Sequence, residues 1–338
     1  MATPTQSLLG ALAITTVVVT IALGWAGWRL LDQQRALDEQ RARDRVESAA
    51  DAVVAGVQGK LAEAAERLSG WVAAPSSSVP MINGASVVAI RGHAVEVNPP
   101  GGLPYVPVVV DAGPETAFAA LEQIEFRGDA PRAIAGYRAQ ATQRDRSVRA
   151  GALLRLGRVQ RKLGDLSGAL VTYEQLAALG PVRVGDLPAE LAGLSGQRAT
   201  YLAMAEQGLV AAVEQQLGRG LDEGRWLITR GPAEFYREPF SEPRPKSWRL
   251  AEALNQTWQD AGERLPTQGY RLFAGGDVLP GSVLVLWRSN EVATAAMAAS
   301  TDTFFNLQER APVAWQLVDA AGQGGGIAFH GGRGAHRC

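Results

Sequence analysis

Two helices joined by a tight turn are predicted between Val148 and Pro181, and this segment constrains the fold more than any other. Residues three or four positions apart share one face of a helix. Small residues at Gly157 and Ala169 allow the two helices to approach closely, because larger side chains there would push them apart. One helix pair cannot bury its own apolar face, so neighbouring pairs are expected. The positions that define the pair are Leu153, Leu156, Gly157, Gly164, Ala169, Tyr173 and Pro181.

An internal repeat with a period of 36 residues supports this prediction. The earlier copy has Gly128, Ala133 and Tyr137 where the later copy has Gly164, Ala169 and Tyr173. A fixed period of this size is typical of stacked helical repeats. The pattern resembles the tetratricopeptide (TPR) family, whose unit is a helix pair of roughly 34 residues, although Gln160 departs from it. With a further TPR-like pair over 187–205 and 209–221, the repeats are expected to occupy residues 113–222.

The composition describes a globular chain without a nucleic-acid footprint. Of 338 residues, 46% are apolar and 20% are charged, which is too apolar for a disordered chain. The net charge of −1 argues against the basic face that nucleic-acid binding requires, so no nucleic-acid partner is expected. Cys338 is the single cysteine, so an intramolecular disulfide is excluded.

An uncharged, apolar run from Leu8 to Trp28 predicts a transmembrane anchor over residues 1–31. As a helix the run is about 30 Å long, which is the thickness of a hydrocarbon core. Trp25 and Trp28 stand where the headgroup level would be, and Arg29 ends the run. A cleaved signal peptide fits less well, because no basic segment precedes the run.

Residues 32–74 are predicted to form an amphipathic stalk helix. Apolar residues recur there at steps of three and four, which places one apolar stripe on a helix. Two interpretations remain open: a helix packed on its own domain, or a coiled coil through which two copies dimerise. The stripe consists of Val46, Ala50, Val53, Val57, Leu61, Ala64, Leu68 and Trp71.

Short extended segments flank the repeats. Residues 75–112 are expected to form a small β segment, with a hairpin around Arg91-Gly92-His93. Residues 223–321 resemble small α/β sensor domains, with helices over 247–264 and 291–309 and strands over 282–287 and 313–318. The Gly-rich residues 322–338 are expected to be a disordered tail. The fold class is therefore mainly α: a transmembrane helix, a long amphipathic helix, a TPR-like array and a small C-terminal α/β domain.

No constellation of catalytic residues is present, and we expect neither an enzyme nor a cofactor. The glycines form no dinucleotide-binding or phosphate-binding loop. His330, His336 and Cys338 have no spacing typical of a metal site and no fourth ligand nearby, so no metal is expected. Acidic and basic residues occur at helical pair spacings, as solvated helix faces do.

The order of these parts resembles the N-terminal input region of TPR-containing bacterial sensor histidine kinases. The most specific portion is Phe118 to Leu179, including FAALEQIEFRGDAPRAIAGYRAQ. The resemblance implies a sensory input module that binds a protein or peptide in the TPR groove. It also implies a single-pass inner-membrane protein with its body outside the cytoplasm, whereas the arginines after Trp28 favour a cytoplasmic body.

The kinase core itself is missing from this sequence. No phosphoacceptor histidine motif, nucleotide-binding box or second apolar span occurs in it. We therefore expect no kinase activity from the chain, and a truncated or frame-shifted reading would explain the Gly-rich end. The alternative function is a membrane-tethered TPR scaffold of the cell envelope.

Overall fold

The computed structural model describes residues 4–75, 78–108, 116–239, 243–262, 264–274, 282–305, 315–319 and 327–331. The chain divides into two compact units, which are described separately. The first comprises Met1–Gly59 with Arg310–Ala314, and the second comprises Lys60–Glu309 with Trp315–Cys338. The described residues form ten α-helices and one five-stranded antiparallel sheet.

Helix α1 (Pro4–Ala73) is 70 residues long. Across the residues that the structure describes, no helix combines the length and the apolar character that crossing a membrane requires. This finding contradicts the predicted anchor over residues 1–31, and with it the transmembrane part of the fold class and the single-pass inner-membrane location. The helix does not end with the apolar run, but continues through charged, exposed residues such as Arg41 and Glu47. Apart from Trp25 and Trp28, which are exposed, the side chains of the run lie outside the described residues.

The C-terminal end of α1, from Lys60 to Ala73, belongs to the second unit and packs against the sheet of that unit. Ala64, Leu68 and Trp71 of the predicted stripe are buried. The guanidinium Nε of Arg288 donates to Ser69 Oγ at 3.2 Å, and Asn290 Nδ2 donates to the Val72 carbonyl at 2.9 Å. Over this part of the stripe, the interpretation as a helix packed on its own domain is confirmed. In the first unit, Val46 is 56% exposed.

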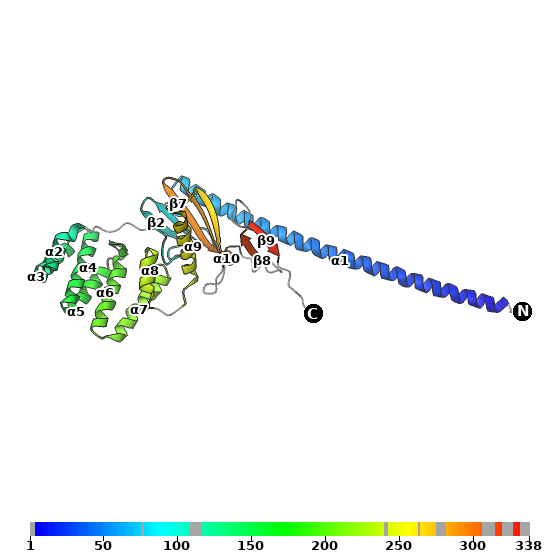
Figure 1. Cartoon of the computed structure of the whole chain (residues 1–338), viewed down its shortest axis with the longest axis horizontal. Helices are drawn as coiled ribbons and strands as arrows, with labels where there is room; N and C mark the ends of the chain where they lie inside the picture. Colours follow the sequence, from blue (N-terminus) through cyan, green and yellow to red (C-terminus); the bar gives the residue numbers. More distant parts are fainter. Residues whose placement is uncertain are drawn as a thin grey trace. The chain divides into compact units, whose positions relative to one another are not determined.

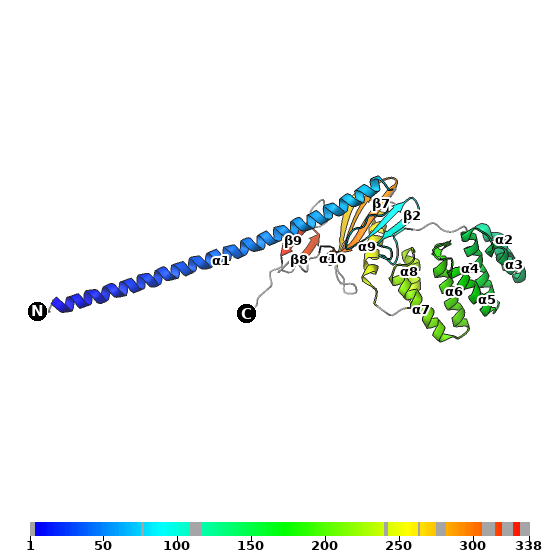
Figure 2. The ribbon, with the colours of Figure 1, turned by 180° about the vertical axis from the view of Figure 1, so that it is seen from behind.

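The sheet combines strands that precede the helical region in the sequence with strands that follow it. Its order is β2-β1-β7-β6-β5, and every neighbouring pair is antiparallel (Figure 2). The predicted hairpin is confirmed, because Arg91 pairs with Ala94. The segments predicted as a separate β segment and a C-terminal α/β domain therefore share one sheet. The strands are β1 (Ala85–Arg91), β2 (Ala94–Asn98), β5 (Gln268–Phe273), β6 (Val283–Ser289) and β7 (Ala293–Ser300).

The helix predicted over residues 291–309 is wrong for residues 293–300, which form strand β7. Alanine has the highest helix propensity, and five of the eight residues in this strand are alanine. The strand is nevertheless central, paired with β1 on one side and with β6 on the other. Burial on both faces overrides the local preference, since Ala296, Met297 and Ala298 are each fully buried. Only the short α10 (Thr301–Phe305) is helical in the described part of this segment.

The helical region lies between β2 and β5 in the sequence, and its helices lie side by side as antiparallel pairs (Figure 1). A two-stranded hairpin, β3 (Arg183–Val184) and β4 (Leu187–Pro188), separates the second pair from the third. The helices are α2 (Ala119–Phe126), α3 (Ala130–Ala141), α4 (Arg146–Lys162), α5 (Leu166–Ala177), α6 (Ala189–Ala203), α7 (Gln207–Asp222) and α8 (Arg230–Arg237), and a 3-10 turn (Thr116–Phe118) precedes α2.

Strand β8 (Trp315–Asp319) pairs with β9 (Ile327–Gly331) in a second small sheet. The strand predicted over 313–318 is thus present in its described part. The tail predicted to be disordered over 322–338 contains strand β9, so the prediction is wrong for residues 327–331. These residues have no apolar period, but their backbone N–H and C=O groups find hydrogen-bond partners in β8. The remaining positions of the tail lie outside the described residues.

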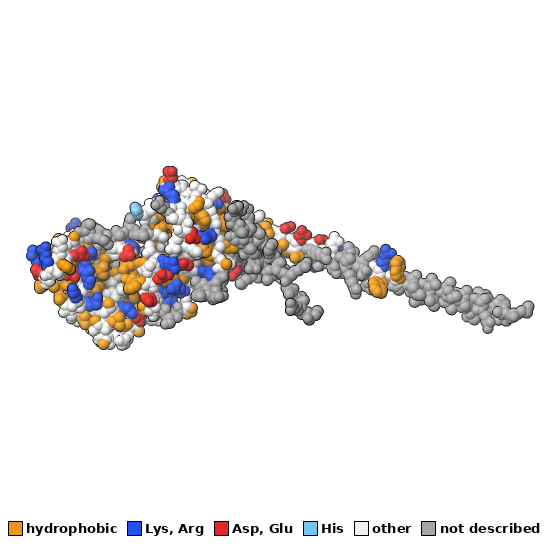
Figure 3. All heavy atoms as spheres, viewed as in Figure 1, with side chains coloured by type: hydrophobic (Ala, Val, Ile, Leu, Met, Phe, Trp, Pro, Cys, Tyr) orange, Lys and Arg blue, Asp and Glu red, His pale blue; other side chains and the backbone are white. Residues whose placement is uncertain are grey.

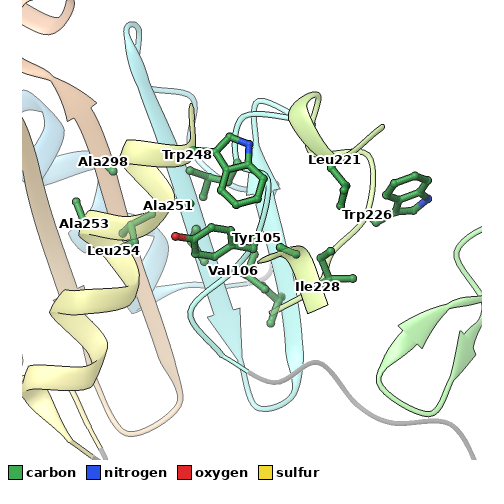
Figure 4. Packing of buried hydrophobic residues seen from close by; sticks show 14 of the residues in the cluster. Tyr105, Val106, Leu221, Trp226, Ile228, Trp248, Ala251, Ala253, Leu254 and Ala298 are labelled. Carbon is green, nitrogen blue, oxygen red and sulfur yellow. The ribbon is translucent and has the colours of Figure 1, made fainter. Parts of the chain in front are cut away.

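Helix α9 (Lys246–Ala261) covers one face of the sheet and supplies the centre of the largest apolar cluster (Figure 4). Trp248 and Leu254 are buried there beside Tyr105 and Ala298. The Tyr105 and Trp248 rings meet edge to face with centroids 5.5 Å apart. The indole Nε1 of Trp248 donates to Asp222 Oδ1 at 2.9 Å, so this side chain also holds α9 to the end of α7.

Replacement of Trp248 should strongly destabilise the second unit. Trp248→Ala removes a side chain that is 2% exposed, leaves a cavity and leaves Asp222 without its indole donor. We expect a loss of about 3–5 kcal/mol in the free energy of unfolding, measured by urea denaturation and circular dichroism. Phe235, which is 67% exposed, offers a matched aromatic control whose alanine variant should change stability by less than about 0.5 kcal/mol. Equal effects of the two substitutions would contradict this packing.

Candidate functional site

The repeated Gly-Asp pairs begin the second helix of the first two helical pairs. Gly128 and Gly164 have φ values of +89° and +82°, a left-handed conformation that glycine adopts without a steric cost. The carboxylate of Asp129 accepts from the backbone N–H of Arg132, and that of Asp165 accepts from Gly168 N–H at 3.0 Å. These carboxylates cap the helices, which explains why the two residues recur together.

Tyr173 sits between two glycines on flanking helices. A Cβ atom at Gly157 on α4 would lie 2.8 Å from the Tyr173 ring, and one at Gly196 on α6 would lie 2.3 Å from it. Gly193 comes still closer to the backbone of α5, where its Cβ would be 2.6 Å from Ala177 N. Three successive helices therefore pack at a separation that only glycine permits. Burial raises the pKa of the Tyr173 phenol, although nearby Arg161 opposes the shift.

The signature residues predicted from the sequence are mostly packing residues. Leu153, Ala169 and Tyr173 belong to one buried cluster. Ala133, Tyr137 and Leu156 belong to the neighbouring cluster. In the second cluster, burial and a hydrogen bond to Glu125 raise the pKa of Tyr137 to about 12. Gly128, Gly157 and Gly164 serve turns and close contacts, whereas Pro181 is exposed.

A surface cavity of about 250 Å³ lies beside α4, and none of the signature residues lines it. One face of α4 contributes residues at steps of three and four, and the β3–β4 turn closes the opposite side. This cavity could not be predicted from the sequence, because the β3–β4 turn lies about 30 residues beyond the helix face that it meets. The sequence signal that pointed towards it was the spacing of Arg155 and Arg158, which places both on one face of α4. The lining residues are Ser147, Gly151, Leu154, Arg155, Arg158, Arg183, Val184, Gly185, Asp186 and Leu187.

Two ion pairs connect the first helices of successive repeats beside this cavity. Arg155 Nε donates to Glu122 Oε1 at 2.6 Å, and Arg158 Nη2 donates to Glu125 Oε2 at 2.8 Å. The Arg155 guanidinium also stacks on Phe118, with its carbon 4.2 Å from the ring centroid. Arg155 is thus held in place, whereas the side chain of Arg158 is 50% exposed and accessible to a partner.

Arg183 is the third cation at the cavity and is held by backbone carbonyls. Its Nη1 donates to the Leu227 carbonyl at 2.8 Å, and its Nη2 donates to the Asp186 carbonyl. Its Nε is buried without a hydrogen-bond acceptor in the described part of the chain. Burial lowers the pKa of this guanidinium, although nearby Asp186 opposes the shift. The charge at Arg183 is therefore less compensated than that of Arg155.

The repeats carry an excess of positive charge. Residues 116–180 contain ten Arg and Lys against six Asp and Glu, in a chain whose overall charge is −1. Three of the six acids, Asp129, Asp145 and Asp165, act as helix caps. Figure 3 shows many Lys and Arg side chains over this region on one face of the molecule. Residues 116–180 therefore carry a formal net charge of +4, from ten basic and six acidic residues.

No family model, curated protein or solved structure matches this chain. The resemblance to sensor-kinase input regions therefore stays a prediction, and the TPR, coiled-coil and signalling assignments gain no support from these comparisons. Among the residues that the structure describes, no group of three or more His, Cys, Asp and Glu is arranged to hold a metal ion. Of the three ligand candidates in the tail, His336 and Cys338 lie outside those residues.

Glycine substitutions test the close packing of the repeats. Gly193→Ala would place a methyl group against the α5 backbone, which cannot move without separating the helices. We expect a loss of about 1–3 kcal/mol in unfolding free energy, measured by urea denaturation. Gly208→Ala is the matched control, because it too lies in a helix but has no neighbour within 4 Å, and it should stabilise by about 0.4–1 kcal/mol. A neutral Gly193→Ala variant would contradict the packing described.

Proposed function

We propose that the chain is a non-catalytic interaction module whose helical repeats bind an extended, acidic segment of a partner protein. The observation that carries this proposal is the cavity beside α4, which combines Arg155, Arg158 and Arg183 with apolar Leu154 and Leu187. Arginine guanidinium groups match carboxylates in a bidentate geometry. The apolar walls would receive a hydrophobic side chain of the same segment.

The state of the three arginines suggests how binding would proceed. The Arg158 side chain is paired with Glu125 but is half-exposed. A carboxylate of the partner can therefore bind Arg158 beside Glu125 or in its place. Arg183 donates to two backbone carbonyls and has no carboxylate partner among the described residues, so its positive charge favours an anionic ligand at the cavity. Arg155, fixed by Glu122 and Phe118, would define the geometry of the site and need not move. A sensory role for such a module stays a prediction from the sequence resemblance.

The proposal predicts preferential binding of an acidic peptide to the full chain. The probe is a short fluorescein-labelled peptide of alternating Glu and Leu, compared with its Lys–Leu and Ser–Leu counterparts by fluorescence anisotropy. The Glu–Leu peptide should bind most tightly and should weaken as salt is added, because screening reduces the attraction.

A charge reversal at the cavity should abolish this preference. Arg158→Glu is expected to weaken binding of the Glu–Leu peptide by about tenfold or more. Arg138→Glu makes the same change of charge on α3, at an exposed residue that does not line the cavity, and should cost about threefold or less. Equal weakening by both variants would attribute binding to net charge and overturn the proposed site, as would equal affinity for all three peptides.

A further inference from the structure

A second cavity, of about 310 Å³, opens at one end of the five-stranded sheet. Its apolar walls come from Ile90 on β1, Val108, and Trp258 and Leu265 in and just after α9. All four belong to, or pack against, the apolar cluster between α9 and the sheet, so the cavity continues the core outwards. Small-molecule pockets span roughly 300–1,000 Å³, which places this cavity at the lower end of that range.

The floor of the cavity is polar at one point. Thr294 pairs with Ile90 on β1 and with Ser289 on β6, so the three residues form one row across the sheet. The hydroxyl groups of Ser289 and Thr294 are 2.7 Å apart and hydrogen-bonded to each other. Thr294 lines the cavity, and its hydroxyl can make more than one hydrogen bond, which leaves capacity for a ligand.

The rim of the cavity carries two opposite charges. Arg264 follows α9, and Glu291 lies in the turn between β6 and β7. Both are exposed, and neither forms an ion pair with the other or with any residue in the described ranges. Unpaired charges of opposite sign beside an apolar pocket are complementary to a small zwitterion.

We propose that this cavity binds a free α-amino acid with an apolar side chain. Arg264 would bind the carboxylate, Glu291 would bind the ammonium group, and the side chain would lie against Trp258, Ile90 and Val108. A purely apolar ligand would leave both rim charges unused, and the middle of a peptide chain has neither terminal charge. This proposal rests on the α/β part of the chain and is independent of peptide binding at the helical repeats.

The test is isothermal titration calorimetry of the full chain with L-leucine and L-phenylalanine at millimolar concentrations. Phenylacetate, which lacks the ammonium group, and phenethylamine, which lacks the carboxylate, are the comparison ligands. Because each lacks one charge-assisted contact, each should bind at least roughly tenfold more weakly than L-phenylalanine. This comparison uses the unaltered chain, so it does not depend on the folding of any variant.

Two substitutions then assign the contacts. Arg264→Gln should reduce the affinity for L-phenylalanine by roughly tenfold while leaving phenethylamine unchanged. Glu291→Gln should reduce the affinity for L-phenylalanine by a similar factor while leaving phenylacetate unchanged. Arg138→Gln makes the same change on α3 and should leave every affinity unchanged. The proposal is overturned if neither amino acid binds, if phenylacetate binds as tightly as L-phenylalanine, or if Arg264→Gln binds like the unaltered chain.

Discussion

The fold depends on the antiparallel pairing of β1 with β7. Seven residue pairs, from Ala85 with Ala299 to Arg91 with Ala293, join segments that are separated by about 200 residues and the whole helical region. Closing so long a loop has a conformational entropy cost that grows only slowly with length. The pairing is nevertheless non-local, so it can form only after distant parts of the chain have met. Both ends of the helical region are thereby tied to one sheet.

Small residues make this arrangement compatible with dense packing. The alanines of β7 have small side chains on both faces of the strand. Helix α9 therefore packs closely on one face of β7, and the opposite face of β7 is buried as well. The helical repeats use the same principle, since Gly157, Gly193 and Gly196 allow α4 and α6 to close on α5 around Tyr173. The two proposed binding sites lie where such packing ends: one beside α4 and the other beyond the end of the sheet.

Local patterns in the sequence predicted the local structure well. The Gly-Asp turns, the hairpin at residues 91–93, the helix at 247–264 and the buried strand at 282–287 each depend on neighbouring residues. Pairing across long sequence distances was not visible in those patterns. The alanine-rich β7 was therefore interpreted as a helix, and β1 and β2 were assigned to a separate segment. The membrane anchor was inferred from the length and apolar character of the run from Leu8 to Trp28, and it is contradicted because no described helix has the length and apolar character to cross a membrane.

The candidate sites were beyond sequence reasoning for a related reason. Each cavity combines residues from elements far apart in the chain, as Ile90 and Arg264 illustrate. Their charged residues are of types ordinary for solvated surfaces, and only the fold shows that these residues meet apolar walls at a cavity. The signature residues of the repeats, in contrast, were identifiable from spacing because their role is packing. They define the helical framework, whereas the neighbouring Arg158 and Arg183 give it a chemical preference.

Hydrogen exchange of the full chain, read by mass spectrometry, tests the β1–β7 pairing most directly. Val88→Pro should break the β1–β7 ladder in the middle of β1. Hydrogen-bonded pairs alternate along an antiparallel ladder, and counted from the two-residue turn closed by Arg91 and Ala94, the amide of Val88 faces Ala296 on β7. Proline lacks that amide hydrogen. If β7 depends on β1, the amides of 293–300 lose protection in this variant together with those of 85–91. Protection of residues 293–300 that is unchanged by Val88→Pro would contradict the pairing and the fold built on it.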